Sequence, residues 1–214
     1  MSQKTRLILT LFLVTSSLTA IGISFWRQDW RYSLPTPRPA GLYQPPLGSA
    51  VPLPPVLARF KRPRRALFLH FVNSRCPCSQ FNLEHVRFLT EQFHSAVDFV
   101  AVVQTPLSER EARAEYSGLH LAMPMVLDSK ARLGSAFGVY STPQAVLLGE
   151  TGQLYFRGNY NLSRYCADAT TEFARLALLA LVNGRPLPAF PQQAMVAYGC
   201  PLRRLRTAPV KGDL

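Results

Sequence analysis

The residues with the clearest chemical potential are Cys76 and Cys78, which flank Pro77 at the start of a predicted helix. The preceding residues 66–72 (ALFLHFV) have the pattern of a buried strand. Cys76 is then an N-cap candidate, and Pro77 takes the first helical position, where its missing N–H costs nothing. Unpaired backbone N–H groups and the helix dipole stabilise a thiolate there, and Arg75 adds a positive charge. We therefore expect at least one of the two thiols to have a lowered pKa.

The chain has four cysteines, which allow three pairings within it. The preferred pairing joins Cys76 to Cys78, and its short spacing predicts a strained disulfide that donates or shuffles disulfides readily. Cys166 and Cys200 would then form a structural bridge or remain as separate accessory thiols. Alternatively, Cys200 folds back and resolves a mixed disulfide at the Cys76–Cys78 centre.

Hydrophobic patterning from residue 66 onward alternates between strands and helices, which indicates an α/β domain. Ser108 with Glu111 has the spacing of a capping box, and Gly138 ends a predicted helix. Strands are predicted over 66–72, 96–103, 123–127, 144–148 and 153–157, and helices over 78–93, 108–119, 128–137 (capped by Asp128) and 168–183.

Two motifs in this order of elements resemble the thioredoxin-like superfamily. Residues 71–78, followed by a helix, look like its strand-loop-helix centre, with the usual two residues between the cysteines reduced to one. Ser141-Thr142-Pro143 before a strand resembles the turn whose proline is cis in that fold. Cys-Pro-Cys-Ser, together with residues 159–166 and 198–200, is also similar to a little-characterised group of bacterial, membrane-anchored redoxins. The implied fold is a central mixed sheet flanked by helices, over residues 66–190.

The resemblance implies a thiol-disulfide oxidoreductase that exchanges disulfides with protein substrates and needs no cofactor beyond its cysteine pair. Its implied site residues are Cys76, Cys78, Pro143 and His70. A cis proline at 143 would lie against the cysteines and accept a substrate chain by strand-like pairing. His70 occupies the position of an acid in related proteins. It either accepts a proton from the second thiol or is a core histidine bonded to a backbone carbonyl.

Three alternatives use the same cysteines differently. A thiol peroxidase would usually place Thr or Ser three residues before its nucleophile, where Asn73 stands here with Arg75 nearby. A Cu(I)-binding or delivery protein would use Cys76 and Cys78 as soft thiolate ligands. No histidine has an obvious ligand position beside the Thr-Pro turn among His85, His94 and His120. A structural domain with inert cysteines would not explain two cysteines around a proline at a helix start.

The N-terminal segment 1–32 is a predicted membrane anchor. Residues 7–26 form an uncharged stretch of twenty residues, which is long enough to cross a bilayer, and Trp26 suits the membrane interface. A cleaved signal peptide is the alternative, but its best cleavage site falls inside the apolar run. Lys4 and Arg6 favour a cytoplasmic N-terminus. The prediction is a single-pass protein of the inner membrane, with its domain on the periplasmic or extracytoplasmic side.

The remaining segments are rich in proline or basic residues. Residues 33–65 form a predicted linker, with eight prolines in the twenty-one residues 35–55, which is typical of a semi-rigid spacer. The net charge is +12, with basic runs at 59–65 and 203–211, the latter in a C-terminal tail 191–214. These runs suit a solvated face or anionic lipid headgroups. They lack interleaved aromatic residues, so no nucleic-acid partner is expected.

Overall fold

The computed structural model describes residues 2–30, 34–162, 166 and 168–202. Its contacts divide the chain into two units, Met1–Leu34 and Pro35–Leu214. The first unit contains helix α1 (Gln3–Phe25) and the short π-helix η1 (Trp26–Trp30). At 23 residues, α1 is about 35 Å long and apolar enough to cross a membrane by length and composition. A signal sequence would have the same properties.

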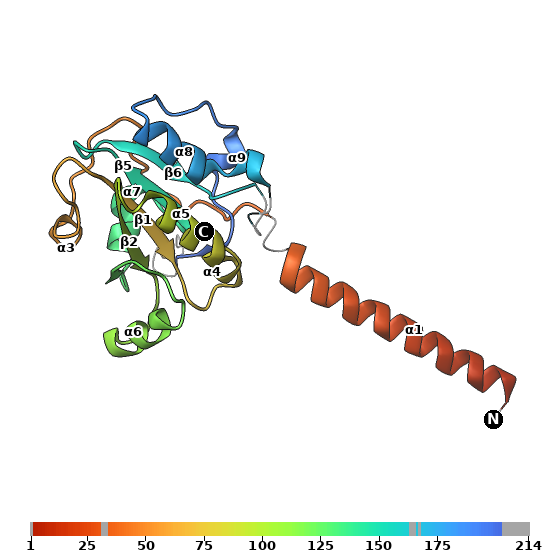
Figure 1. The fold of residues 1–214 in the computed structure, drawn as a ribbon. Coiled ribbons are helices and arrows are strands. Elements are labelled where there is room, and N and C mark those ends of the chain that lie inside the picture. Colours follow the sequence, from red (N-terminus) through yellow and green to blue (C-terminus); the bar gives the residue numbers. More distant parts are fainter. Residues whose placement is uncertain (1, 31–33, 163–165, 167, 203–214) are drawn as a thin grey trace, which may run out of the picture. The chain divides into compact units, whose positions relative to one another are not determined.

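The second unit is built on a five-stranded sheet with the order β3-β2-β1-β5-β6 (Figure 1). Strands β1, β2 and β3 run parallel, whereas β5 lies antiparallel to β1 and β6 antiparallel to β5. Their bounds are β1 Ala66–Val72, β2 Val97–Val103, β3 Met125–Leu127, β5 Gln144–Leu148 and β6 Leu154–Gly158. This is the predicted central mixed sheet, and helices flank it.

Helices cover both faces of the sheet, which explains why all seven residues of β1 are buried (Figure 1). Phe68 and Val72 pack in one core cluster with side chains of α5, α6 and α8. Leu69 and Phe71 belong to the opposite cluster, with side chains of α3 and α7. These helices are α3 Pro55–Ala58, α5 Leu83–Phe93, α6 Glu109–Ser117, α7 Arg132–Phe137 and α8 Phe173–Val182.

The helix predicted over 78–93 is broken into two. Helix α4 (Pro77–Phe81) ends at Asn82, and α5 begins immediately after it. The Asn82 side chain is buried, and its amide oxygen lies 3.0 Å from the sulfur of Cys166. A polar side chain held inward at this position marks the break, and the residue pattern alone did not reveal it.

Other helix ends depend on local hydrogen bonds. Ser108 and Glu111 form the predicted capping box of α6, and Gly138 ends α7 in the left-handed conformation. Helix α7 begins later than predicted, because Asp128 accepts hydrogen bonds from the backbone N–H groups of Arg132 and Gly134 across a turn. The predicted helix 168–183 is likewise a short 3-10 turn, η2 (Ala169–Thr171), followed by α8.

The proline-rich segment 35–55 is part of the second unit, whereas its composition predicted a semi-rigid spacer. Val51 and Leu57 are buried in the core cluster beneath α7. The backbone N–H of Gly48 donates to the carbonyl of Leu154 in β6 at 2.7 Å. Because burial of these apolar side chains is favourable, the segment packs as part of the domain instead of extending from it as a linker.

The described part of the C-terminal tail is also folded onto the domain. It contains helix α9 (Gln192–Met195) and strand β7 (Cys200–Pro201), which pairs antiparallel with β4 (Ser141–Thr142). Leu202 is buried in the same core cluster as Phe137. The basic run 203–211 lies outside the described residues.

The basic run at 59–65 is partly neutralised within the domain. Asp98 on β2 is buried, and its carboxylate receives hydrogen bonds from the guanidinium groups of Arg62 and Arg65 at 2.7 and 2.8 Å. Two of the arginines that suggested a lipid-facing surface, Arg62 and Arg65, therefore have a structural partner in Asp98.

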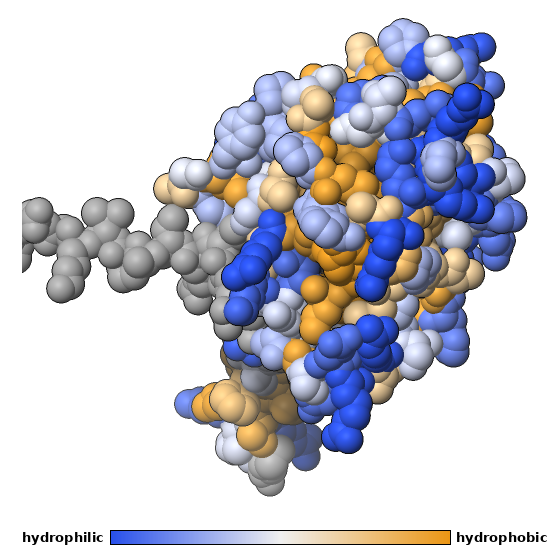
Figure 2. Space-filling model, turned by 90° about the vertical axis from the view of Figure 1, so that its left-hand side faces the viewer, coloured by the Kyte–Doolittle hydropathy of each residue, from blue (hydrophilic) through white to orange (hydrophobic). Residues whose placement is uncertain are grey.

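The molecular surface is mixed in character on the face drawn in Figure 2. A band of hydrophobic residues runs there between hydrophilic ones.

Candidate active site

The disulfide of the structure joins Cys76 to Cys200 across a sequence separation of 124 residues, with a Cα–Cα distance of 6.1 Å. The preferred pairing of Cys76 with Cys78 is therefore wrong, as is a Cys166–Cys200 bridge. Cys76 is the extended N-cap of α4, whereas Cys78 lies in the first helical turn and is only 4% exposed. The backbone thus sends the two side chains in different directions, and the tail supplies the partner for Cys76.

Strand pairing brings Cys200 to this position. Cys200 of β7 lies directly opposite Thr142 of β4. The peptide bond between Thr142 and Pro143 is cis, as predicted from the Thr-Pro turn. The sulfur of Cys76 lies 3.5 Å from the carbonyl oxygen of Thr142. The start of α4, the cis-proline turn and the C-terminal tail therefore meet at one sulfur pair.

The tail is fitted closely against β4. Gly199 has a φ of +128°, and a Cβ atom there would lie 2.2 Å from the carbonyl oxygen of Thr142. The hydroxyl of Thr36 donates to the carbonyl of Gly199 at 3.1 Å, and the backbone N–H of Thr36 donates to Ala197. The tail before Cys200 is thus held between Thr36 of the proline-rich segment and the cis-proline turn.

Cys166 is not part of the Cys76–Cys200 disulfide and has a different environment. Its thiol donates to the side-chain oxygen of Asn82 at 3.0 Å. Burial, with a smaller contribution from the negative charge of Glu172, raises the pKa of Cys166 to about 12. A thiol with this pKa is protonated at neutral pH, so Cys166 is a poor nucleophile in this conformation.

His70 lies at the centre of β1 and is fully buried. Its Nδ1 atom is 2.6 Å from the hydroxyl of Tyr160, so the predicted backbone-carbonyl partner is wrong. Nε2 has no hydrogen-bond partner within the described part of the chain. Burial lowers the pKa of His70 to about 3, and burial also raises the pKa of Tyr160 well above its usual value. The pair is therefore neutral at physiological pH.

The charge of Arg75 is directed to a carboxylate instead of to the cysteines. Its guanidinium forms an ion pair with Glu115 of α6 at 2.6 Å, and the hydroxyl of Ser74 donates to the same carboxylate. These hydrogen bonds lower the pKa of Glu115. Glu115 thereby ties the loop before Cys76 to α6, a role that the sequence did not indicate.

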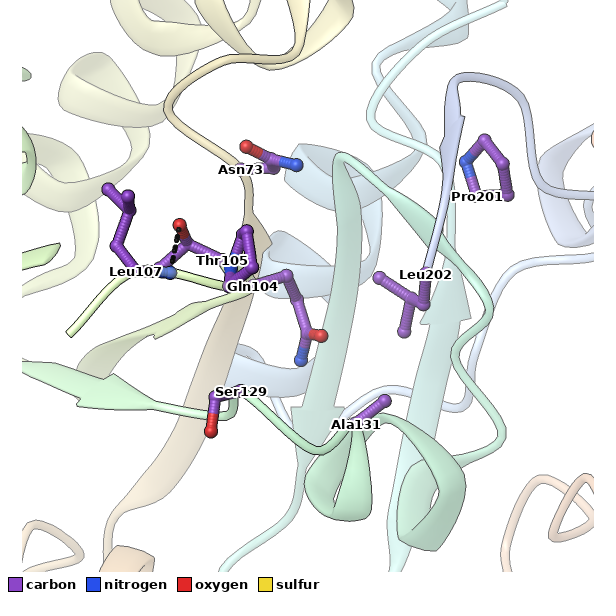
Figure 3. Close-up of a pocket in the computed structure, with 9 residues that line it drawn as sticks. Asn73, Gln104, Thr105, Leu107, Ser129, Ala131, Pro201 and Leu202 are labelled. Atoms are coloured by element: carbon purple, nitrogen blue, oxygen red, sulfur yellow. Dashed lines mark hydrogen bonds between the residues drawn. The ribbon is translucent and has the colours of Figure 1, made fainter. Parts of the chain in front are cut away.

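A pocket of about 270 Å³ lies beside the tail, where β1 and β2 end (Figure 3). Figure 3 shows the Leu202 side chain directed toward the part of the pocket formed by Gln104 and Ala131. Gln104 is held by a hydrogen bond to Asp128 at 2.6 Å. The lining residues are Asn73, Gln104, Thr105, Pro106, Leu107, Ser129, Ala131, Pro201 and Leu202.

The cysteine geometry also bears on the Cu(I) alternative. Cu(I) binds thiolates, and Cys76 is held in a disulfide, so a site at Cys76 and Cys78 would first require reduction. Within the residues that the structure describes, no cluster of three or more His, Cys, Asp or Glu side chains is arranged to hold a metal ion.

Comparison with known proteins places this site within a family. The family described as "Domain of unknown function (DUF6436)" matches residues 51–201. The chain belongs to the DUF6436 family. The DUF6436 match includes all four cysteines, His70 and Pro143. No curated protein matches the sequence.

Solved structures resemble the DUF6436 chain across most of its length. An uncharacterized conserved protein from Geobacillus kaustophilus is 21% identical, with a TM-score of 0.63, covering 82% of this chain and 99% of its own. A hypothetical protein from Sinorhizobium meliloti 1021 is 21% identical, with a TM-score of 0.64 and coverages of 78% and 97%. A secreted Mycobacterium tuberculosis disulfide oxidoreductase homologous to E. coli DsbE is 16% identical, with a TM-score of 0.43 and coverages of 59% and 85%. The first two share the fold.

The sequence identified some residues of this site and not others. The structure places the Cys76 sulfur beside the carbonyl oxygen of Thr142, the residue before Pro143, and buries Cys76, Cys78 and His70. Cys200 was weighed only as an alternative partner. Tyr160 was within a quoted motif but was not assigned a contact, and the only signal for it was the position of an aromatic residue after β6.

Proposed function

We propose that this chain is a thiol-disulfide oxidoreductase that exchanges disulfides with protein substrates through Cys76, with Cys200 as the second thiol of its redox couple. The observation that supports this most strongly is the Cys76–Cys200 disulfide beside the cis Thr142-Pro143 bond. A purely structural disulfide would need no particular surroundings beyond its two cysteines. Here a helix start and a cis-proline turn lie beside the Cys76 sulfur, and such surroundings are those of a site where disulfides are exchanged.

The exchange is a pair of thiolate attacks. In the reduced protein, the Cys76 thiolate attacks one sulfur of a substrate disulfide, and the other substrate sulfur leaves with the electron pair. The Cys200 thiolate then attacks the Cys76 sulfur, which breaks the mixed disulfide and releases the second substrate thiolate. The substrate gains two electrons and the Cys76–Cys200 pair loses them. An external dithiol restores the pair by the same exchange, and the reverse direction oxidises a substrate dithiol.

Cys78 is the reserve thiol in this scheme. It lies in the first turn of α4 and is buried, as Cys76 is, while Cys200 is half-buried on the tail. Cys200 therefore resolves the mixed disulfide, and Cys78 does so when the tail is absent. His70 keeps its place in the proposal as the candidate proton acceptor for a buried thiol; its Nδ1 contacts Tyr160, and Nε2 has no hydrogen-bond partner among the described residues. Burial lowers its pKa to about 3 in this structure, so it would take up a thiol proton only in a state that raises this pKa.

The proposed location is the inner membrane, with α1 as an uncleaved single-pass anchor and the domain outside the cytoplasm. The length and composition of α1 support this, as do Lys4 and Arg6 in its first turns. An extracytoplasmic compartment also allows a disulfide to persist. Fusing alkaline phosphatase to the C-terminus tests this, because that enzyme is active only outside the cytoplasm. An inactive but fully expressed fusion would reverse the orientation.

The catalytic proposal is tested by insulin reduction with the full chain purified in detergent. With dithiothreitol as the electron source, the wild type should accelerate reduction at least tenfold over dithiothreitol alone. Cys76→Ser should abolish that acceleration, whereas the matched Cys166→Ser variant should retain it, because Cys166 lies outside the exchange centre. Equal activity of wild type and Cys76→Ser would overturn the proposal.

A further inference from the structure

We propose that β4 and the adjacent core cluster that buries Leu202 form a binding groove for an extended cysteine-containing peptide, and that the C-terminal tail occupies this groove as a built-in substitute for the substrate. The selected peptide has the pattern small residue, cysteine, any residue, apolar residue. In the tail this pattern is Gly199-Cys200-Pro201-Leu202. The inference rests on the proposed exchange at Cys76 and adds the substrate class to it.

The position before the cysteine accepts only a very small residue. A Cβ atom at Gly199 would come within 2.2 Å of the Thr142 carbonyl oxygen, and the nearest atoms beyond it belong to Thr142 and Ser141. Those atoms are part of β4 itself, so the limitation belongs to the groove. A substrate chain paired with β4 in the same register would meet the same obstacle.

The position two residues after the cysteine is an apolar anchor. Leu202 is 4% exposed and packs in the cluster that contains Leu133 and Phe137. Its methyl group occupies space that a Cβ at Gly134 would otherwise take, at 2.7 Å. Its backbone N–H donates to the carbonyl of Tyr140 at 3.0 Å, which fixes the direction of the chain. A charged side chain in this place would be buried without a partner.

The residue between cysteine and anchor is left open. Pro201 is exposed and pairs with Ser141 only through the strand register. Burial on one side and exposure on the other is the alternation expected for a peptide added to a sheet edge. The groove therefore discriminates at two positions and tolerates variation at the third.

The tail and the substrate exclude each other, because both use β4 and the Cys76 sulfur. When a substrate strand forms a mixed disulfide with Cys76, the tail lies outside the groove. When the tail returns, Cys200 attacks the Cys76 sulfur, the mixed disulfide breaks, and the substrate cysteine leaves as a thiolate. Return of the tail thus couples resolution of the mixed disulfide to release of the peptide.

The test uses full-length Cys78→Ser/Cys200→Ser protein, so that neither thiol resolves the mixed disulfide at Cys76. The probes are pentapeptides whose cysteine is activated as a 2-pyridyl disulfide. Attack by Cys76 joins it to the peptide sulfur and releases pyridine-2-thione, whose absorbance is followed. The peptide Tyr-Gly-Cys-Pro-Leu should react at least tenfold faster than Tyr-Val-Cys-Pro-Leu and than Tyr-Gly-Cys-Pro-Asp. The peptide Tyr-Gly-Cys-Ala-Leu should react within about threefold of the first.

Two controls separate the groove from the exchange chemistry. Small 2-pyridyl disulfides such as dipyridyl disulfide report the reactivity of Cys76 alone. If these react and the pentapeptides show equal rates, the groove is wrong while the exchange proposal stands. If Cys76 reacts with none of them in folded protein, the exchange proposal itself fails. The Cys76→Ser/Cys78→Ser/Cys200→Ser variant is the control for every probe. It lacks the attacking thiol, so the pentapeptides should release no pyridine-2-thione above the background rate.

Discussion

Cys200 lies directly opposite Thr142, the residue whose peptide bond to Pro143 is cis. The pairing places the tail cysteine where its sulfur joins that of Cys76, at the carbonyl of Thr142. A two-residue strand is a small element, and its position depends on contacts on either side of it. Those contacts give the first prediction.

Replacing Gly199 with Ala should destabilise the protein more than the same change at a glycine that has a positive φ but open space around it. The new Cβ would clash with the Thr142 oxygen, and the positive φ adds backbone strain. We expect a loss of about 3 kcal/mol in the free energy of unfolding. Gly152→Ala is the matched control, because its φ is +87° with nothing within 4 Å. It should cost about 1 kcal/mol. Similar losses for both variants, in urea titrations of oxidised protein, would contradict the fit of the tail.

The buried His70 should make stability depend on pH. Its pKa falls from 6.5 to about 3 on folding because of burial. Between these values the unfolded chain holds a proton that the folded chain does not, so acidification favours unfolding. From pH 6 to pH 4, the wild type should lose about 1.4 kcal/mol per pH unit more than His70→Gln. Parallel pH profiles for the two proteins would show that His70 is protonated in the folded state.

Asp98 should anchor the basic run to the sheet. Burial opposes the charged form of its carboxylate, but hydrogen bonds from Arg62 and Arg65 outweigh that effect and lower the pKa of Asp98. Asp98→Asn should destabilise the domain by about 3 kcal/mol, because two guanidinium groups lose their charged partner. The exposed pair of Glu109 and Arg113 provides the control, and Glu109→Gln should cost less than about 1 kcal/mol. Equal losses would mean that Asp98 is not a structural partner.

The thiols should differ sharply in alkylation rate. After reduction, iodoacetamide at pH 8 should modify Cys200 faster than Cys166, because Cys200 lies half-buried on the tail, whereas burial holds the Cys166 thiol protonated. Cys166 should remain largely unmodified until the protein is unfolded, since burial raises its pKa to about 12. Mass spectrometry of the digested protein measures each site. Modification of Cys166 as fast as Cys200 in folded protein would contradict this local environment.

The sequence predicted the features that depend on local patterning. The buried runs of β1 and β5 and the capping box at Ser108 follow from short stretches of residues, and the cis bond before Pro143 is what the resemblance of the Thr-Pro turn implied. The cysteine pairing did not, because it depends on a strand contact between segments far apart in the chain. No periodicity reveals which edge a two-residue tail strand will join.

Two other differences have the same physical origin. The break at Asn82 arises from a side chain drawn inward, next to Cys166 from a distant loop. The proline-rich segment lies on the domain because Val51 and Leu57 find cover there, although proline content alone suggests an extended spacer. In both cases, tertiary packing overrides the local preference.

The most direct test is the connectivity of the cysteines across a glutathione redox titration of the full chain in detergent. Samples are trapped with acid and alkylated, and the linked peptides are identified by mass spectrometry without reduction. The account predicts reversible conversion between a Cys76–Cys200 disulfide and two thiols in folded protein, with Cys78 and Cys166 unlinked throughout. A dominant Cys76–Cys78 linkage, or a Cys76–Cys200 bond that opens only on denaturation, would contradict it.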